Sequence, residues 1–360
     1  MTNKLKNLQL QKHYSFWKIN NKLHLKNKLK MAIIKDVKFF IQCSENLREL
    51  YENTDGNRQR QLITMLKTWL FYNSTSKDIY WTGKSSRSII NGGVKVKEHW
   101  YGNLSSAEYI LNSNVGNEDF FELSKIEQFL KIFQFMQWNY TTQQENQMLR
   151  NFQNPNRFYN EFNGNPNLMY NEAGIDLVDV NLENNLLPQF ERFFNNENYQ
   201  ENNNSYIFEV TLSNNLLVIF CNALEAAENY FQIEVSKMKI GKKGMVFRIN
   251  SRNSFASFYR ITMFALWRCF SNQTQIQNFL IETNREIGET GPYREENNFD
   301  ARFGNYAFSL NIVEGDLFNN TVWLWSRYND SEKYRLLSQI LEFFDANLFI
   351  YDHNLNLLEF

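Results

Sequence analysis

The sequence predicts an α+β protein, with a helical N-terminal region that carries a small ββα element and a second part built on antiparallel hairpins. Apolar residues recur at spacings of three and four in residues 36–73 and 123–137, which is the helical period. Residues 206–210 alternate and residues 245–249 form a short apolar run, as strands do. Because hairpins and helices are segregated along the chain, we expect α+β rather than a parallel α/β sheet.

The length of 360 residues predicts two domains. We expect a basic leader at 1–30, a first domain at 31–180, a linker at 181–205 and a second α+β domain at 206–360. The leader has eight lysines and no acidic residue. A nucleic-acid-binding arm, a disordered leader and a true start at Met31 all remain open.

Composition favours a globular protein of a reducing compartment. Apolar residues make up 43% and charged residues 21% of the chain, and no run approaches the roughly 18 apolar residues of a membrane span. Cys43, Cys221 and Cys269 are widely spaced and form neither a metal motif nor an even disulfide set. We expect a cytoplasmic protein without a membrane partner.

The expected elements follow the chain in order. The first domain has helices within 36–73, a strand from Val94 to Trp100, and helices at 105–113 and 123–137. A helix capped by Thr141 or Thr142 comes next, then a short helix, a glycine cap and a strand within 168–178. The second domain has a hairpin over 206–220, a helix at 222–230, strands at 231–235 and 245–249, helices at 255–270 and 275–287, a strand at 321–328 and a helix at 334–344.

One constellation in the first domain could support phosphodiester hydrolysis. Glu98 and His99 end a predicted strand, and Asn146 lies in the first turn of the later helix, beside Glu145. A histidine can activate water near neutral pH, and one divalent ion can stabilise the charge of the transition state. Carboxylate and amide oxygens suit Mg²⁺ or Mn²⁺. We therefore expect His99 as general base and Glu98 and Asn146 as metal ligands.

The order of four short motifs resembles HNH-type (His-Me finger) endonuclease-like proteins of bacteria and phages. These motifs are Trp81-Thr82, Lys97-Glu98-His99, Tyr140-Thr141-Thr142 with Glu145-Asn146 and Leu149, and Tyr170 with Ala173-Gly174-Ile175. The resemblance covers about residues 36–180. It implies a ββα-metal fold and a DNA endonuclease of the restriction or phage-defence type. The chain departs from the pattern in having Trp100 after the Glu-His pair and a long insert between the two halves.

The second domain contains an acid-free basic span. No Asp or Glu occurs from Val235 to Ile281, although the chain beyond the leader has 30 basic against 39 acidic groups. Such clusters contact phosphates. The expected DNA-binding residues are Lys237, Lys239, Lys242, Lys243, Arg248 and Arg252. A solvated basic hairpin with no partner is the alternative.

Three functions therefore remain open. The first is a metal-dependent endonuclease with DNA as partner, for which a homodimer is one open assembly state. The second is a catalytically inactive nucleic-acid-binding or sensor protein on an HNH-like fold, and the third is an accessory subunit of a larger assembly.

Overall fold

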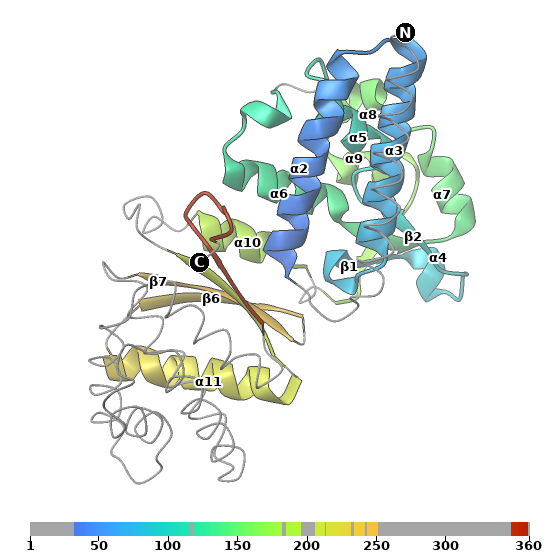
Figure 1. The fold of residues 1–360 in the computed structure, drawn as a ribbon. Helices are drawn as coiled ribbons and strands as arrows, with labels where there is room; N and C mark the ends of the chain where they lie inside the picture. The colour runs from blue at the N-terminus through green and yellow to red at the C-terminus, as the bar shows by residue number, and fades with distance from the viewer. Residues whose placement is uncertain are drawn as a thin grey trace.

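The computed structural model describes residues 32–115, 118–181, 185–195, 206–212, 214–231, 234–241, 243–250 and 347–358. Within these ranges the chain forms a helical unit around one four-stranded sheet and a second unit around another (Figure 1). The expected α+β class is thereby confirmed. The leader at 1–30 and the elements expected at 255–270, 275–287, 321–328 and 334–344 lie outside the described residues.

The expected elements of the first unit occur in the expected order. Its helices and strands are α2 (Ile33–Glu52), α3 (Gly56–Thr75), η1 (Asp78–Tyr80), β1 (Trp81–Ser86), α4 (Arg87–Ile90), β2 (Val96–His99), α5 (Asn103–Leu111), η2 (Phe120–Glu122), α6 (Lys125–Met136), β3 (Trp138–Thr141), α7 (Gln143–Leu149), α8 (Pro155–Glu161), α9 (Pro166–Glu172) and β4 (Leu177–Asp179). Of these, β1, α4, β3 and α8 are present in addition to the expected elements.

Apolar stripes and caps account for the longer helices of this unit. Phe40 of α2 stacks on Trp69 of α3 with ring centroids 4.5 Å apart, so the two stripes face each other. A capping box of Ser124 and Glu127 begins α6. Each apolar side chain buried in such a contact contributes about 1.5–3 kcal/mol.

The first sheet has the strand order β2-β3-β1-β4. Strands β1 and β3 run parallel, while β2 pairs antiparallel with β3 and β4 antiparallel with β1. In the β2–β3 ladder Glu98 lies opposite Asn139, and His99 lies opposite Trp138. Helix α7 follows β3 directly and packs on β2, so two antiparallel strands and a helix meet as a ββα arrangement.

The second unit contains α10 (Leu187–Phe194), β5 (Ile207–Thr211), α11 (Asn214–Phe231), β6 (Glu234–Ile240), β7 (Gly244–Asn250) and β8 (Asn347–Tyr351). Its sheet has the order β6-β7-β5-β8, with every pair antiparallel. In Figure 1 the yellow α11 lies along one face of this sheet. The expected pairing of two strands around the turn at 241–244 is confirmed, but the first strand runs Glu234–Ile240 rather than 231–235, and Phe231 ends α11.

Two expectations for this unit are wrong. Residues 216–220 do not pair with 206–210 as a hairpin, because they lie inside the 18-residue helix α11. The expected linker at 181–205 contains α10, whose Phe190, Phe193 and Phe194 are buried in the main core. That core is continuous between the units, since it also contains Ile33 of α2 and Ile207 of β5.

No helix in the described ranges has the length and apolarity needed to cross a membrane.

Candidate functional site

The end of β2 directs its neighbouring side chains to opposite faces of the sheet. Successive residues of a strand alternate in this way. His99 faces α3, where its ring stacks on Phe71 with centroids 5.5 Å apart. Trp100 faces the other side, where its ring packs against that of Tyr170 on α9 with ring centroids 5.1 Å apart. Glu98 shares the side of Trp100, so the expected acid and base do not face a common cavity.

His99 is enclosed in an apolar interior. Its exposed fraction is 0%, and its Nε2 lies 2.7 Å from the Ser74 hydroxyl. No partner is within hydrogen-bonding reach of Nδ1 in the described structure. Burial lowers the pKa of His99 to about 3. The imidazole therefore stays neutral near pH 7 and has no path to a water molecule or phosphate, which does not fit the expected role of general base.

Glu98 lies in a buried polar layer on the opposite face. Its carboxylate accepts a hydrogen bond of 2.8 Å from Gln153 Nε2, and only 7% of the residue is exposed. Burial raises the pKa of Glu98 to about 7, although the bond from Gln153 opposes this rise. The neighbouring Asn139 accepts a hydrogen bond from the Thr82 hydroxyl. This layer ties β1, β2 and β3 together beneath α7 and α9.

The expected metal site is not assembled by these residues. Asn146 lies half-buried on α7, which contacts β2 as the sequence predicted. Glu98, however, is held by Gln153, and His99 points away from α7. In the described ranges no group of three or more His, Cys, Asp and Glu side chains could hold a metal ion. His99 and Glu98 lie on opposite faces of β2, so Glu98, His99 and Asn146 do not converge on one ion as expected.

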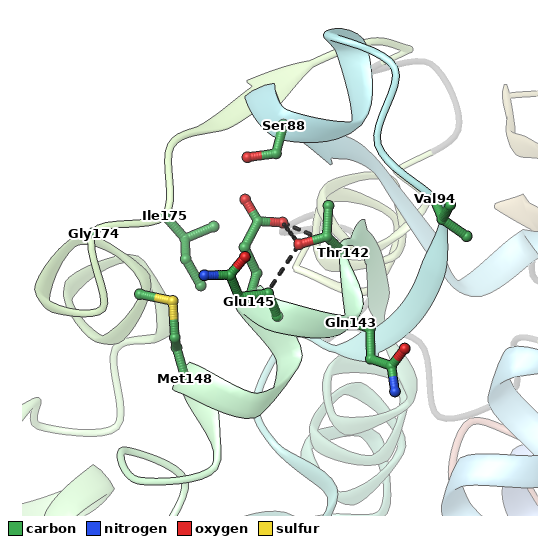
Figure 2. Close-up of a pocket in the computed structure, with 9 residues that line it drawn as sticks. Ser88, Val94, Thr142, Gln143, Glu145, Met148, Gly174 and Ile175 are labelled. Atoms are coloured by element: carbon green, nitrogen blue, oxygen red, sulfur yellow. Dashed lines mark hydrogen bonds between the residues drawn. The ribbon is translucent and has the colours of Figure 1, made fainter.

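A cavity of about 460 Å³ lies on the outer side of α7 (Figure 2). Ser88, Thr142, Glu145, Met148 and Ile175 are among its lining residues. Figure 2 shows the Glu145 carboxylate turned toward the Thr142 hydroxyl at the start of α7. Of the two threonines expected as the cap, Thr142 is the N-cap, and it forms a capping box with Glu145.

Glu145 is occupied by structural hydrogen bonds. Its Oε2 accepts from the Thr142 backbone N–H at 2.7 Å and from the Ser86 hydroxyl at 2.7 Å. Partial burial raises the pKa of Glu145, but these bonds and one from Ser88 outweigh it, so the pKa is lowered. The carboxylate is ionised and links the end of β1 to α7. It is not free to act as a base or as a ligand.

The expected DNA-binding residues are divided by the fold. Lys237 forms ion pairs with Glu228 at 2.6 Å and Glu225 at 3.4 Å, both on α11. Arg248 is fully buried, with its guanidinium 5.8 Å from the Phe193 ring centroid. Lys242 and Arg252 lie outside the described side chains.

The two remaining basic residues lie at one end of the β6–β7 hairpin. Lys239 and Lys243 are exposed beside the turn at Gly241. Neither forms an ion pair with any residue of the described part of the chain.

Sequence reasoning missed the polar layer around Glu98. Thr82, Asn139 and Gln153 come from separate elements, and no short motif joins them. The alternation of side chains along β2 could nevertheless be read from the sequence, and it places Glu98 and His99 on opposite faces of the sheet.

Comparisons of the chain with family models, with curated proteins and with solved structures find no match.

Proposed function

We propose that this protein binds DNA without cutting it, through the basic end of the β6–β7 hairpin. The observation that carries the proposal is the exposure of Lys239 and Lys243 at the turn of a regular hairpin. Lysines held this way can contact successive phosphates and release counterions on binding. The ββα arrangement of β2, β3 and α7 is then an HNH-like scaffold without a working base.

The buried position of His99 favours binding over hydrolysis. A general base must reach the proton that it removes, directly or through one water molecule. His99 reaches Ser74 and Phe71 instead. His99 in this position does not fit the role of a general base in hydrolysis.

Binding of a short labelled DNA duplex at several salt concentrations tests the proposal. We expect affinity to fall steeply with salt, with a slope of about −0.9 for each phosphate contacted. The double variant Lys239→Gln/Lys243→Gln should bind at least about tenfold more weakly and reduce the slope by up to about 2. The matched control is Arg58→Gln/Arg60→Gln on α3, which removes the same charge from the first unit.

A cleavage assay separates the proposal from the nuclease hypothesis. Plasmid DNA is incubated with the purified protein and Mg²⁺, Mn²⁺ or EDTA, and we expect no conversion beyond a protein-free sample. Metal-dependent cleavage would contradict the proposal, as would equal binding by the two double variants.

A further inference from the structure

The first unit has another cavity, of about 240 Å³, which lies among α5, α6 and α8 and shares no lining residue with the cavity beside α7. Aromatic side chains form its inner wall. Tyr109 of α5 and Phe135 of α6 are buried, and Tyr159 of α8 stacks on Tyr109 with ring centroids 5.6 Å apart. Among the described lining side chains, only that of Phe135 lacks a polar atom, so the cavity suits a polar ligand.

The two charged side chains that line this cavity neutralise each other. Lys131 Nζ lies 3.5 Å from Glu118 Oε1, and the same oxygen accepts a hydrogen bond of 3.0 Å from the Tyr109 hydroxyl. Lys131 also lies over the ring of Tyr109, with Nζ 5.3 Å from the centroid. A charged ligand would meet a cation and an anion together and would gain little from either. The pair therefore favours a ligand without net charge.

Neutral polar side chains around the cavity have hydrogen-bonding groups that no other described residue uses. Gln134 Nε2 donates to the hydroxyl oxygen of Tyr101, which leaves Gln134 Oε1 as an acceptor and the Tyr101 O–H as a donor. The exposed carboxamides of Asn114, Asn160 and Asn163 make no hydrogen bond with another described residue. Each carboxamide can both donate and accept, so these groups match a ligand whose own groups do both, as hydroxyls do.

The size of the cavity and its aromatic wall limit the ligand further. Pockets for drug-sized ligands measure about 300–1,000 Å³, so this smaller cavity suits a molecule of one ring. The rings of Tyr109 and Tyr159 already stack on each other, and Lys131 lies over Tyr109, so little aromatic surface remains for a flat base to stack on. A compact ring that carries many hydroxyl groups fits these limits better than a planar heterocycle.

We propose that this cavity binds a neutral monosaccharide, with the amides of Gln134, Asn114, Asn160 and Asn163 and the Tyr101 hydroxyl bonding its hydroxyl groups. The aromatic wall packs against the C–H groups of the sugar ring. This site is independent of the proposed DNA binding, because the β6–β7 hairpin belongs to the second unit and contributes no lining residue. Loss of either activity would therefore leave the other unchanged.

Saturation-transfer NMR on the full chain tests the site. The probes are D-glucose, D-galactose, D-mannose and D-ribose, and we expect at least one to bind with a Kd of about 1 mM, since a single sugar ring is small and the mouth of the cavity is open to water. Adenine is the contrasting probe. It should bind at least about threefold more weakly than the best sugar, because the stacked tyrosines offer it no free ring face.

Asn160→Ala is the variant that links binding to this cavity. It removes the hydrogen bonds of one carboxamide, so the affinity for the best sugar should fall about 3- to 10-fold. Asn171→Ala is the matched control and should bind as the unmodified chain does. Asn160 and Asn171 are both exposed, and each is the next-to-last residue of a seven-residue helix, α8 and α9 respectively, but Asn171 does not line the cavity.

A second variant leaves the backbone as it is. Asn163 has a φ of 49°, which glycine adopts without strain, so Asn163→Gly removes the carboxamide and keeps the turn. It should weaken sugar binding to a similar extent as Asn160→Ala. The proposal would be overturned if none of the four sugars showed saturation transfer, if adenine bound more tightly than every sugar, or if Asn160→Ala and Asn171→Ala had equal affinities.

Discussion

Replacement of His99 by Phe should make the protein less sensitive to acid. His99 is buried against Phe71, and burial lowers its pKa from 6.5 to about 3. The native state therefore binds fewer protons than the unfolded chain between these two values. Stability contributed by the neutral ring is present above the unfolded value and is lost as the pH falls toward the folded value.

The magnitude follows from the two pKa values. Between about pH 7 and pH 5 the unfolded chain gains about 0.7 of a proton at this position, and the stability lost over this range is about 2 kcal/mol. His99→Phe removes this loss and leaves the other titrating groups in place. Phe fills the ring volume and avoids a cavity. Ser74 keeps its hydrogen bonds to the backbone carbonyls of Leu70 at 2.8 Å and Phe71 at 3.2 Å. Stability at pH 7 should change by about 1 kcal/mol or less.

Urea unfolding of both proteins, followed by tryptophan fluorescence at the two pH values, measures this difference. On acidification, the free energy of unfolding of the unmodified protein should fall by about 2 kcal/mol more than that of the variant. Equal losses would refute the reasoning, because they would mean that His99 titrates alike in the folded and unfolded chains. An NMR titration of the His99 ring near its ordinary pKa would lead to the same conclusion.

Two further predictions concern Glu98 and Gly93, which lies in the turn between α4 and β2. Glu98 has a raised pKa of about 7, so its contribution is present at acidic pH and is lost as the pH rises toward that value. Between about pH 5 and pH 8, the free energy of unfolding of Glu98→Gln in the same urea assay should fall by about 2.5 kcal/mol less than that of the unmodified protein. An equal fall in the two proteins would contradict this. Gly93→Ala should lower stability by about 1–3 kcal/mol, since its Cβ would lie 2.8 Å from both the Ser88 carbonyl oxygen and Thr142 Cγ2. A thermal unfolding midpoint equal to that of the unmodified protein would show that the turn relaxes.

The local features of the fold were predictable because their determinants are close in sequence. The capping box of Thr142 and Glu145 spans three residues, and it begins α7 as expected. The strand ending at His99 was shorter than predicted but present. The turn at Gly174, with φ of 69°, also follows a short helix as the sequence indicated.

The helix over residues 216–220 shows where local pattern is insufficient. A run of about five apolar residues is compatible with a strand or with a buried helix. The following segment, Asn222 to Tyr230, favoured a helix, and the run simply extends it as the first half of α11. In α10, Phe190, Phe193 and Phe194 have helical spacing, but the flanking Asn-rich sequence obscured this short stripe.

The candidate site was less predictable because the exposure of its side chains depends on which helices pack on the faces of β2. His99 could have faced solvent if the face of β2 that carries it were open. The residue that stacks on it, Phe71, belongs to α3, which is separated from β2 by η1, β1 and α4, and no motif connects the two. Residue type and spacing identify a histidine at a strand end, whereas its burial is a property of the tertiary packing.

Transient opening of α3 is not a route by which His99 could regain a catalytic role. The helix buries Leu62, Leu66, Trp69 and Leu70 against the core. At about 1.5–3 kcal/mol for each side chain, their exposure would cost about 6–12 kcal/mol. This is comparable to the entire free energy of unfolding of an ordinary domain, about 5–15 kcal/mol. Exposure of His99 through displacement of α3 is therefore equivalent to unfolding the first unit.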